Sequence, residues 1–546
     1  MFHAFQERLL AMANRSGRWP ARLVTWSLTG LFSVWVVLDV LAFGMTRGLP
    51  QTTYDAMTRA RFWAAAPDPR IIIIDIDESS LSRMSHEFGR WPWPRDTLAT
   101  LLEFIEKQAP TAVVWDIVFS DADRLSPGGD AAFEAAVRRS PNSHFSIIRL
   151  PPKNDHLSQI NQTLLPPLWA KNDEKSKVSA SPSPVAMVAP ALEAVARSSL
   201  GYNNGYVDKD GVLRRYRYAE RLPDGSVIQS LAMSVLKVVD ERAFQRRVED
   251  SSANYQPRGE LISWREQPNA YPRVAFADVF ALAEGAKPWQ DVPSLAGKII
   301  IIGSTAPSLH DIHPTPLSPV QAGVDSLATA IDNAINDRSL HELPGWVKAL
   351  LAVVLCLALA MWVQFNGVSS LAPALLVLPA GLMATSYLSL NGSPLFLDLQ
   401  LPATLTLILL GMLRYWNGFR RNHWCNTPSQ TDSLLLWCLK SRSSWSEESI
   451  DHLIDALEQH ASQCRILVGD CQVYWPAKLR WPELSRYASI IGPQEALENA
   501  LPALRLAIKP LIESANIPQP IASGADRKTL ASLSQHAWAQ YTPSIN

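Results

Sequence analysis

The chain has 546 residues, and at roughly 150 residues per domain it should form about three units. Its 50 basic and 51 acidic residues give a formal net charge of -1, so there is no basic surplus to support nucleic acid as a partner. Only 18% of the residues are charged, below the roughly 25% typical of soluble domains, which indicates that part of the chain lies in lipid.

The first predicted element is a membrane helix near the N-terminus. Residues 23–45 are mostly apolar, and a helix of about 20 such residues crosses a hydrocarbon core about 30 Å thick. The apolar stretch is too long for a cleavable signal peptide, and no clean cleavage site follows it. We therefore expect a retained anchor, preceded by a cytoplasmic segment at 1–22.

The next unit, at 46–345, alternates short apolar runs with amphipathic helices. Strands buried on both faces are predicted by the apolar runs at 70–76, 112–119, 144–150 and 298–303, and helices by the patterns at 97–108 and 130–137. This alternation predicts an α/β fold with a mostly parallel sheet and flanking helices. Two stretches break the pattern: 153–184 is expected to be a mobile loop, and 238–293 has no assignment.

Three further membrane helices are predicted in quick succession at 346–365, 371–390 and 395–416. Arginines flank the first and last of the four helices: Arg8, Arg15, Arg18 and Arg22 before the first, and Arg414, Arg420 and Arg421 at the last. Since basic flanks stay in the cytoplasm, both termini should be cytoplasmic and 46–345 periplasmic, in a bacterial inner membrane. No cysteine lies in 46–345, which agrees with this topology.

Three charged residues fall within or beside the predicted membrane helices: Asp39, Lys348 and Asp398. Intramembrane carboxylates are functional candidates by default. The favoured interpretation is an interfacial polar cluster that holds the helix bundle together, and a relay role is the alternative.

The tail, 417–546, is predicted to be a small α/β module. Its expected elements are helices at 447–461 and 495–514 and strands at 465–468 and 488–491. Three aromatic residues, Trp475, Trp481 and Tyr487, could form a partner surface or belong to its core. The tail lacks kinase, cyclase and phosphate-loop motifs, so we expect no enzyme activity, no catalytic residue and no cofactor. Cysteine spacing predicts no metal site.

Polar residues gather where the predicted strands end, and ligands of open α/β sheets bind beyond the carboxyl ends of strands. These residues, with two that could approach the same edge, are Asp75, Asp77, Arg95, Asp116, Ser304 and Asp311. One hypothesis is a polar pocket for a small ligand or a cation, since carboxylate oxygens bind hard cations. The other, which we favour, is that the acids cap helices and pair with Arg95 and other basic residues to close the fold. The run Asp208–Gly211 is read as a β-turn rather than a calcium loop.

Several motifs in 46–345 resemble the CHASE type 2 (CHASE2) domain. They are IIIIDIDESSL, GRWPWPR, AVVWDIVF, GYNN, DKDGVLRR, LAGKIIIIGSTA and Asp311. The resemblance implies an inner-membrane receptor with one helix before the sensor domain and commonly three after it. Relatives usually carry a kinase or cyclase output, which this chain lacks. The chain also departs from the family at 323–326, where relatives tend to carry a His-Ala pair.

Two functions follow from these observations. The first is a receptor-like membrane protein whose periplasmic domain binds an envelope signal or protein and whose tail acts through a separate effector, with a homodimer possible. The alternative is a structural or assembly subunit of an envelope machine, such as a secretion or surface-polymer system, that uses the sensor fold as a docking surface.

Overall fold

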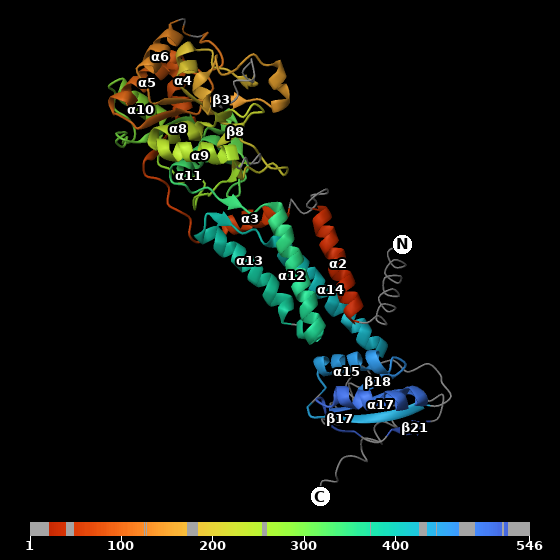
Figure 1. Cartoon of the computed structure of the whole chain (residues 1–546). Coiled ribbons are helices and arrows are strands. Elements are labelled where there is room, and N and C mark those ends of the chain that lie inside the picture. Colours follow the sequence, from red (N-terminus) through yellow and green to blue (C-terminus); the bar gives the residue numbers. More distant parts are fainter. Residues whose placement is uncertain are drawn as a thin grey trace, which may run out of the picture. The chain divides into compact units, whose positions relative to one another are not determined.

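The computed structural model describes residues 21–39, 49–124, 126, 128–171, 184–253, 259–371, 373–424, 434–443, 445–468, 486–515 and 518–521. The chain divides into two compact units, both drawn in Figure 1. The sheet unit comprises Leu49–Leu343 and Ser386–Leu397, and the helical unit comprises Met1–Gly48, Pro344–Thr385 and Asp398–Asn546.

The sheet unit is built on one seven-stranded sheet in which all strands but one are parallel. Its order is β11-β1-β12-β2-β3, with β6 paired in parallel and β5 antiparallel to β3. The strands are β1 (Ile71–Ile76), β2 (Ala112–Trp115), β3 (Ser143–Arg149), β5 (Met187–Val188), β6 (Ser199–Tyr202), β11 (Arg273–Ala275) and β12 (Ile299–Ser304). The parallel-rich α/β fold predicted from the apolar runs is therefore confirmed.

Helices cover both faces of this sheet (Figure 1). One face carries α4 (Glu78–Phe88), α5 (Arg95–Lys107), α6 (Gly129–Arg138) and α10 (Phe276–Ala283), and the other carries α8 (Leu231–Val239) and α11 (Gly323–Ile335). Side chains alternate along a strand, so Ile72 and Ile74 of β1 belong to the core under the first face. Burial on both faces explains why β1 and β12 read as continuous apolar runs.

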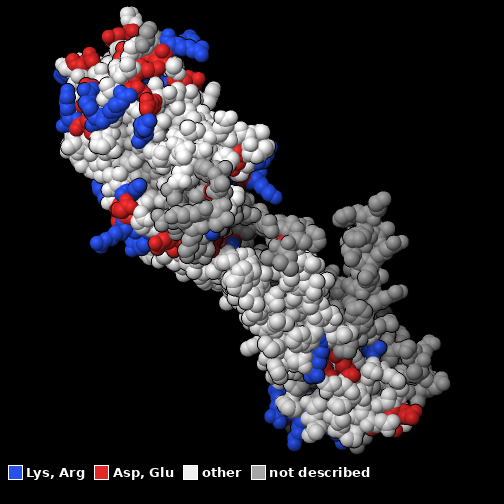
Figure 2. All heavy atoms as spheres, turned by 45° about the horizontal axis from the view of Figure 1, so that its top comes forward, with Lys and Arg blue, Asp and Glu red and all other residues white. Residues whose placement is uncertain are grey.

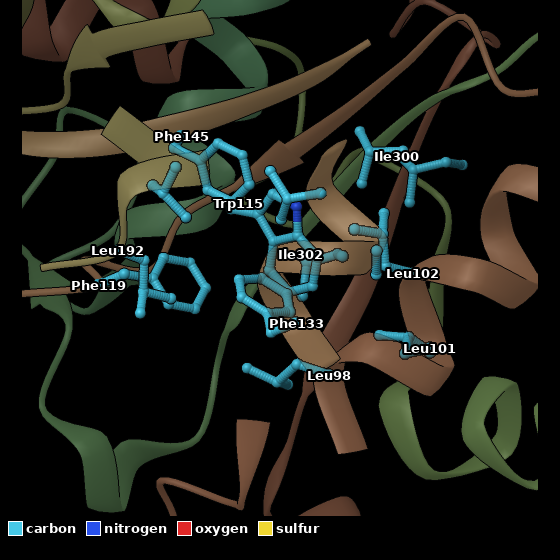
Figure 3. Close-up of a cluster of buried hydrophobic side chains, with 14 of the residues drawn as sticks. Leu98, Leu101, Leu102, Trp115, Phe119, Phe133, Phe145, Leu192, Ile300 and Ile302 are labelled. Atoms are coloured by element: carbon cyan, nitrogen blue, oxygen red, sulfur yellow. The ribbon is translucent and has the colours of Figure 1, made fainter. Parts of the chain in front are cut away.

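Four aromatic rings meet in this core beside the end of β2 (Figure 3). The Trp115 ring lies parallel to that of Phe145, with 6.0 Å between their centroids, and meets the Phe133 ring edge-on at 5.4 Å. Phe119 stacks on Phe133 at 4.9 Å. All four side chains are almost fully buried. This packing holds both sides of the turn that contains Asp116, the first residue after β2.

Three segments that are distant in sequence meet in a junction of the sheet unit. Helix α3 (Leu49–Arg59) places Tyr54 against Phe396, with 5.6 Å between their ring centroids. β15 (His341–Glu342) pairs in parallel with β16 (Leu395–Phe396). The prediction of a membrane helix from residue 395 is therefore wrong at its start, because Leu395 and Phe396 form a strand and the helix begins at Gln400.

The two stretches that broke the sequence pattern contain short regular elements. The unassigned region holds α9 (Glu241–Ala253), β10 (Glu260–Leu261), β11 and α10. The predicted mobile loop contains β4 (Trp169–Lys171) and two 3-10 turns, while its residues 172–183 lie outside the described residues. The remaining elements of the sheet unit are α7 (Glu193–Arg197), β7 (Arg215–Tyr216), β8 (Ala219–Arg221), β9 (Val227–Gln229), β13 (Ile312–His313) and β14 (Gln321–Ala322).

The helical unit contains helices at all four predicted membrane segments. They are α2 (Ala21–Leu38), α12 (Gly345–Asn366), α13 (Ala374–Gly392, whose last residues belong to the sheet unit) and α14 (Gln400–Trp424). Only α12 and α13 are long and apolar enough to be candidate spans among the described residues; the apolar part of α2 has 17 residues. The four-span topology therefore stays a prediction. In Figure 2 the visible surface of these helices is largely uncharged.

The tail is an α/β module with the strand order β18-β19-β17-β20, and its pairs are antiparallel. Its elements are β17 (Leu434–Ser441), α15 (Glu447–His460), β18 (Arg465–Val468), β19 (Tyr487–Pro493), α17 (Gln494–Ile508), β20 (Ile512–Ala515) and β21 (Gln519–Ile521). Among the described residues, the elements from β17 to β20 follow the βαββαβ order of the ferredoxin-like arrangement, and β21 adds a further strand beside β17. The prediction of one helix over 495–514 is wrong at its end, because residues 512–515 form a strand on β17.

Candidate functional site

A pocket of about 740 Å³ lies where β1, β12 and β2 end. The carboxyl ends of these neighbouring parallel strands meet at one edge of the sheet, the usual place for ligands in open α/β folds. The pocket is lined by Ile76, Trp91, Pro92, Trp93, Arg95, Leu98, Asp116, Ile117, Val118, Ser120, Asp121, Ala122, Asp123, Arg124, Ser304, Leu309 and Asp311. Four of the six predicted site residues are among them: Arg95, Asp116, Ser304 and Asp311.

Two indole rings form an aromatic part of the lining. Trp91 and Trp93 meet edge to face, with ring centroids 5.0 Å apart and planes at 89°. The peptide bond between Trp91 and Pro92 is cis. Trp93 is only 2% exposed and packs against Phe276 at 4.7 Å. The Trp-Pro-Trp-Pro motif thus supplies a pocket wall anchored in the hydrophobic core.

Arg95 begins helix α5, and its groups are held by the loop that follows β2. The Arg95 backbone N–H donates to Asp123 Oδ2 at 2.8 Å, which places a carboxylate at the positive end of the helix. The guanidinium lies over the Phe119 ring, 4.5 Å from its centroid, and donates to the Asp121 carbonyl oxygen at 3.2 Å. Burial lowers the pKa of Arg95. These contacts fix Arg95 at the pocket.

Asp116 is half-buried and only partly hydrogen-bonded. Asn203 Nδ2 donates to its Oδ1 at 2.8 Å, and Tyr216 donates its hydroxyl to Asn203 Oδ1 at 3.3 Å. The other carboxylate oxygen, Oδ2, is buried without a hydrogen-bond partner among the described residues. Burial, and then the nearby Asp311 carboxylate, raise the pKa of Asp116 to about 7. This carboxyl group can therefore gain or lose a proton near neutral pH.

Asp311 approaches the pocket from the loop before β13. Its carboxylate lies 3.6 Å from His313 Nε2, and the Gly323 backbone N–H donates to the Asp311 carbonyl oxygen at 2.9 Å. The hydrogen bond to Asp311 raises the pKa of His313. A Cβ atom at Gly323 would lie 2.3 Å from Asp311 Oδ2. Gly323 belongs to the segment 323–326, which differs from the family pattern. Its lack of a side chain leaves room for the Asp311 carboxylate at the start of α11.

The two other predicted acids serve the fold instead of lining the pocket. Asp77 caps helix α4 by accepting the Ser80 backbone N–H at 2.7 Å. Asp75 is 4% exposed and accepts hydrogen bonds from both the backbone N–H and the hydroxyl of Thr305. Arg273 joins Asp75, at 3.5 Å, to Asp325, at 2.7 Å. The interpretation that acids cap helices and pair with arginines thus describes Asp75 and Asp77.

Ser304 has a structural role as well as a place at the pocket. Its hydroxyl donates to the Ile76 carbonyl oxygen at 2.9 Å and accepts the Ala306 backbone N–H at 3.0 Å, so it ties the ends of β1 and β12 together. Among the described residues, no group of three or more His, Cys, Asp or Glu side chains is arranged to hold a metal ion. The described residues therefore do not support the hypothesis that the pocket binds a metal cation.

Two contributors to the site were not predicted as site residues, Asn203 and His313. Asn203 belongs to the Gly-Tyr-Asn-Asn motif, which the family resemblance had singled out without a role. His313 had no signal in the sequence, because its partner Asp311 and its strand β13 are recognisable only in the fold.

A second group of acids surrounds the pair Arg214 and Arg215, and we call it the arginine clasp. It consists of Arg214, Arg215, Asp55, Asp208, Asp210 and Glu342. Arg214 is 1% exposed and donates to both oxygens of Asp55 at 2.8 and 2.6 Å and to both of Asp210 at 2.8 and 2.7 Å. The predicted turn is confirmed by the bond from the Gly211 N–H to the Asp208 carbonyl oxygen.

The clasp ties two distant parts of the chain to the arginines that follow the Asp208–Gly211 turn. Asp55 lies on α3 near the start of the sheet unit, and Glu342 lies on β15 just before α12. Arg215 donates to Glu342 Oε2 at 2.8 Å and to Asp208 Oδ2 at 2.7 Å. Each guanidinium is paired with more than one carboxylate, and Asp208 joins Arg214 to Arg215, so the clasp is a closed structural network.

The helical unit contains the three charged residues that were predicted to form a polar cluster. Lys348 of α12 and Asp398 form an ion pair at 2.6 Å, and both lie near the start of their helices. The prediction that Asp398 lies within a membrane helix is wrong, because α14 begins at Gln400. Asp39, directly after α2, is buried. The predicted polar cluster thus includes the ion pair Lys348–Asp398.

Helix α14 is joined to the tail module by ion pairs. Arg420, 1% exposed, pairs with Asp455 and with Glu458, the latter at 2.7 Å. Arg421 pairs with Asp451 at 2.8 Å, and both acids and Glu458 lie on α15. The arginines that predicted the orientation of the last helix therefore also dock the tail. Trp475 and Trp481 lie outside the described residues, whereas Tyr487 is buried.

Comparison with known families identifies the part of the chain that contains the pocket. The CHASE2 domain matches residues 31–362, which is more than half of the chain. No curated protein and no solved structure matches the chain.

Proposed function

Because the chain belongs to the CHASE2 domain family, a family of sensor domains, we propose that it is a receptor-like membrane protein without a catalytic output of its own. In this proposal the four helices cross a bacterial inner membrane, and both termini are cytoplasmic. The sheet unit binds a signal from the envelope in its pocket. The tail passes the signal to a separate effector protein.

The observation that carries this proposal is the pocket at the edge of the sheet. Its volume of about 740 Å³ falls in the range of roughly 300–1,000 Å³ typical of small-molecule sites. Its lining combines apolar side chains with a few convergent polar groups, which is the usual composition of such sites. A structural subunit that used this fold only for docking would not require an open, mixed pocket at this position.

The packing of the helical unit supports four spans. Val24 of α2, Cys356 of α12 and Leu409 of α14 belong to one hydrophobic core, so α2 and α14 pack with a helix that meets the length and composition of a span. The paired arginines Arg420 and Arg421 give α14 a firm connection to the tail. A displacement of α14 would therefore be carried to the tail module.

The test compares the partners of three versions of the tagged full-length chain after mild crosslinking in native membranes. They are the wild type, Ala122→Trp, which adds a large side chain at an exposed position of the pocket lining, and Ala286→Trp, at an exposed position that does not line the pocket. We expect mass spectrometry to recover a signalling partner crosslinked to the tail, in an amount that changes in Ala122→Trp and not in Ala286→Trp.

The opposite result would assign a different function. Secretion or export components recovered in the same fixed ratio with all three versions would make the chain a structural or assembly subunit. The pocket would then have no part in its function.

A further inference from the structure

The pocket carries negative charge at one place in particular. Of its four lining carboxylates, that of Asp123 accepts backbone N–H groups from Arg95 and Ser126, and Asp121 Oδ2 accepts the Ser120 hydroxyl. Asp116 and Asp311 form no ion pair with arginine or lysine in the described part of the chain, and His313 is the basic side chain beside them. The local charge at this pair of carboxylates is thus only partly balanced.

The unused hydrogen-bonding capacity of Asp116 points to a donor. Its Oδ2 is buried without a partner, although ionised carboxylate oxygens are strong acceptors. The environment that raises the pKa of Asp116 to about 7 disfavours an isolated charge there. A positively charged donor between Asp116 and Asp311 would satisfy Oδ2 and favour the ionised carboxylate. An anionic ligand group at this place would be repelled.

The remaining lining favours an organic cation over a metal ion. Hard metal ions such as Ca²⁺ take about six to eight oxygen ligands, whereas no metal-holding group exists among the described residues. Indole faces attract cations and bury apolar groups, and Trp91 and Trp93 supply such surfaces in the same pocket. Ile117, Val118 and other apolar residues extend this surface.

From these contacts we infer that the pocket takes a small organic cation, with its amine between Asp116 and Asp311 and its apolar body against Trp91 and Trp93. The inference rests on the proposed function, since it names the class of ligand for the same pocket. A protonated primary amine supplies three N–H donors to the two carboxylates.

The test uses three probes of similar shape and different charge on the full-length chain in detergent at pH 8, where Asp116 is largely ionised. They are 2-phenylethylamine, 2-phenylethanol and phenylacetate, and binding is measured by saturation-transfer NMR. We expect only the amine to bind, with a Kd of about 1 mM or lower. Asp116→Asn should weaken amine binding about tenfold or more. The matched control is Asp337→Asn, at a 90% exposed carboxylate outside the pocket, which should change binding less than about twofold.

The outcomes separate the ligand class from the receptor function. Equal binding of all three probes, unchanged amine binding in Asp116→Asn, or no amine binding at about 10 mM would overturn the organic cation. Binding of 2-phenylethanol or phenylacetate that Ala122→Trp abolishes would also overturn the cation, yet it would support a ligand-binding pocket. Failure of the receptor proposal itself would appear in the partner experiment, which uses no probe.

Discussion

Two acid-rich regions of the sheet unit are built from the same residue types and serve opposite purposes. In the arginine clasp, two buried guanidinium groups satisfy four carboxylates in a closed network. Within the described residues, Asp116 and Asp311 of the pocket have no such arginine partner, and one buried oxygen of Asp116 has no donor. The comparison shows that carboxylates become candidates for ligand binding where the fold places no arginine or lysine beside them.

The largest effect is expected from breaking the clasp. Arg214→Ala would leave Asp55 and Asp210 without their main partner at a buried position, so we expect a loss of about 3–5 kcal/mol in the free energy of unfolding. Thermal unfolding of the full-length chain in detergent measures this loss. Arg138→Ala, which removes a 59% exposed partner of Glu134, is the control and should cost less than about 0.5 kcal/mol. Similar effects of both variants would refute the closed network.

Removing a charge from the pocket should have the opposite effect and raise the free energy of unfolding. Asp116→Asn removes a carboxylate whose ionisation is disfavoured and keeps an oxygen to accept from Asn203. We expect the variant to be more stable at pH 8 by roughly 1–3 kcal/mol, a reduced figure because the side chain is only half-buried. The same unfolding experiment measures this gain. A destabilised variant would mean that the charge of Asp116 serves the fold.

A smaller loss of stability is expected at Asp77, which caps a helix and does not line the pocket. Asp77→Ala removes the cap of α4 and should cost about 1 kcal/mol. Binding of 2-phenylethylamine should stay unchanged, because Asp77 does not line the pocket. Thermal unfolding and probe titration on one preparation give both values. A loss of binding without a loss of stability would return Asp77 to the site.

The smallest effect is the pH dependence of stability. The pKa values of Asp116, at about 7, and Asp325, at about 6, are raised mainly by burial, so the folded state holds protons that the unfolded state releases. Stability should therefore rise as pH falls from 8 to 6.5, with Asp116 contributing less than about 1 kcal/mol. The raised pKa of His313 acts in the same direction. Burial lowers the pKa of His144 to about 4, so this side chain opposes the trend increasingly as pH approaches and falls below 6.5, the ordinary pKa of histidine. An equal slope in Asp116→Asn would contradict the assignment.

The sequence was most informative where the physical signal is local. Continuous apolar runs predicted β1, β2, β3 and β12, since strands covered on both faces need no polar side chains. Parallel strands end at one edge, so Asp116 and Ser304 could be placed together before the fold was known. Asp77 also carried a local signal, because an acid directly before a helix is a typical N-cap.

The rest depends on contacts between distant residues. Asp75 and Asp77 look alike in the sequence, but Asp75 is held by Thr305 and Arg273, which lie about 200 residues away. The clasp is equally hidden, because Asp55 and Arg214 are 159 positions apart. In the tail, the error at 495–514 had a local cause: Pro510 cannot continue the helix, and α17 ends at Ile508.

The junction of α3, β15 and β16 has a consequence for how the protein is made. Phe396, which is 2% exposed, and its strand β16 are synthesised after α12 and α13, although they complete a unit whose main part ends at Leu343. During translation the sheet unit therefore stays incomplete until the loop between α13 and α14 has emerged. A fragment that stops at residue 343 would lack this closing strand and leave the Tyr54 ring without its partner.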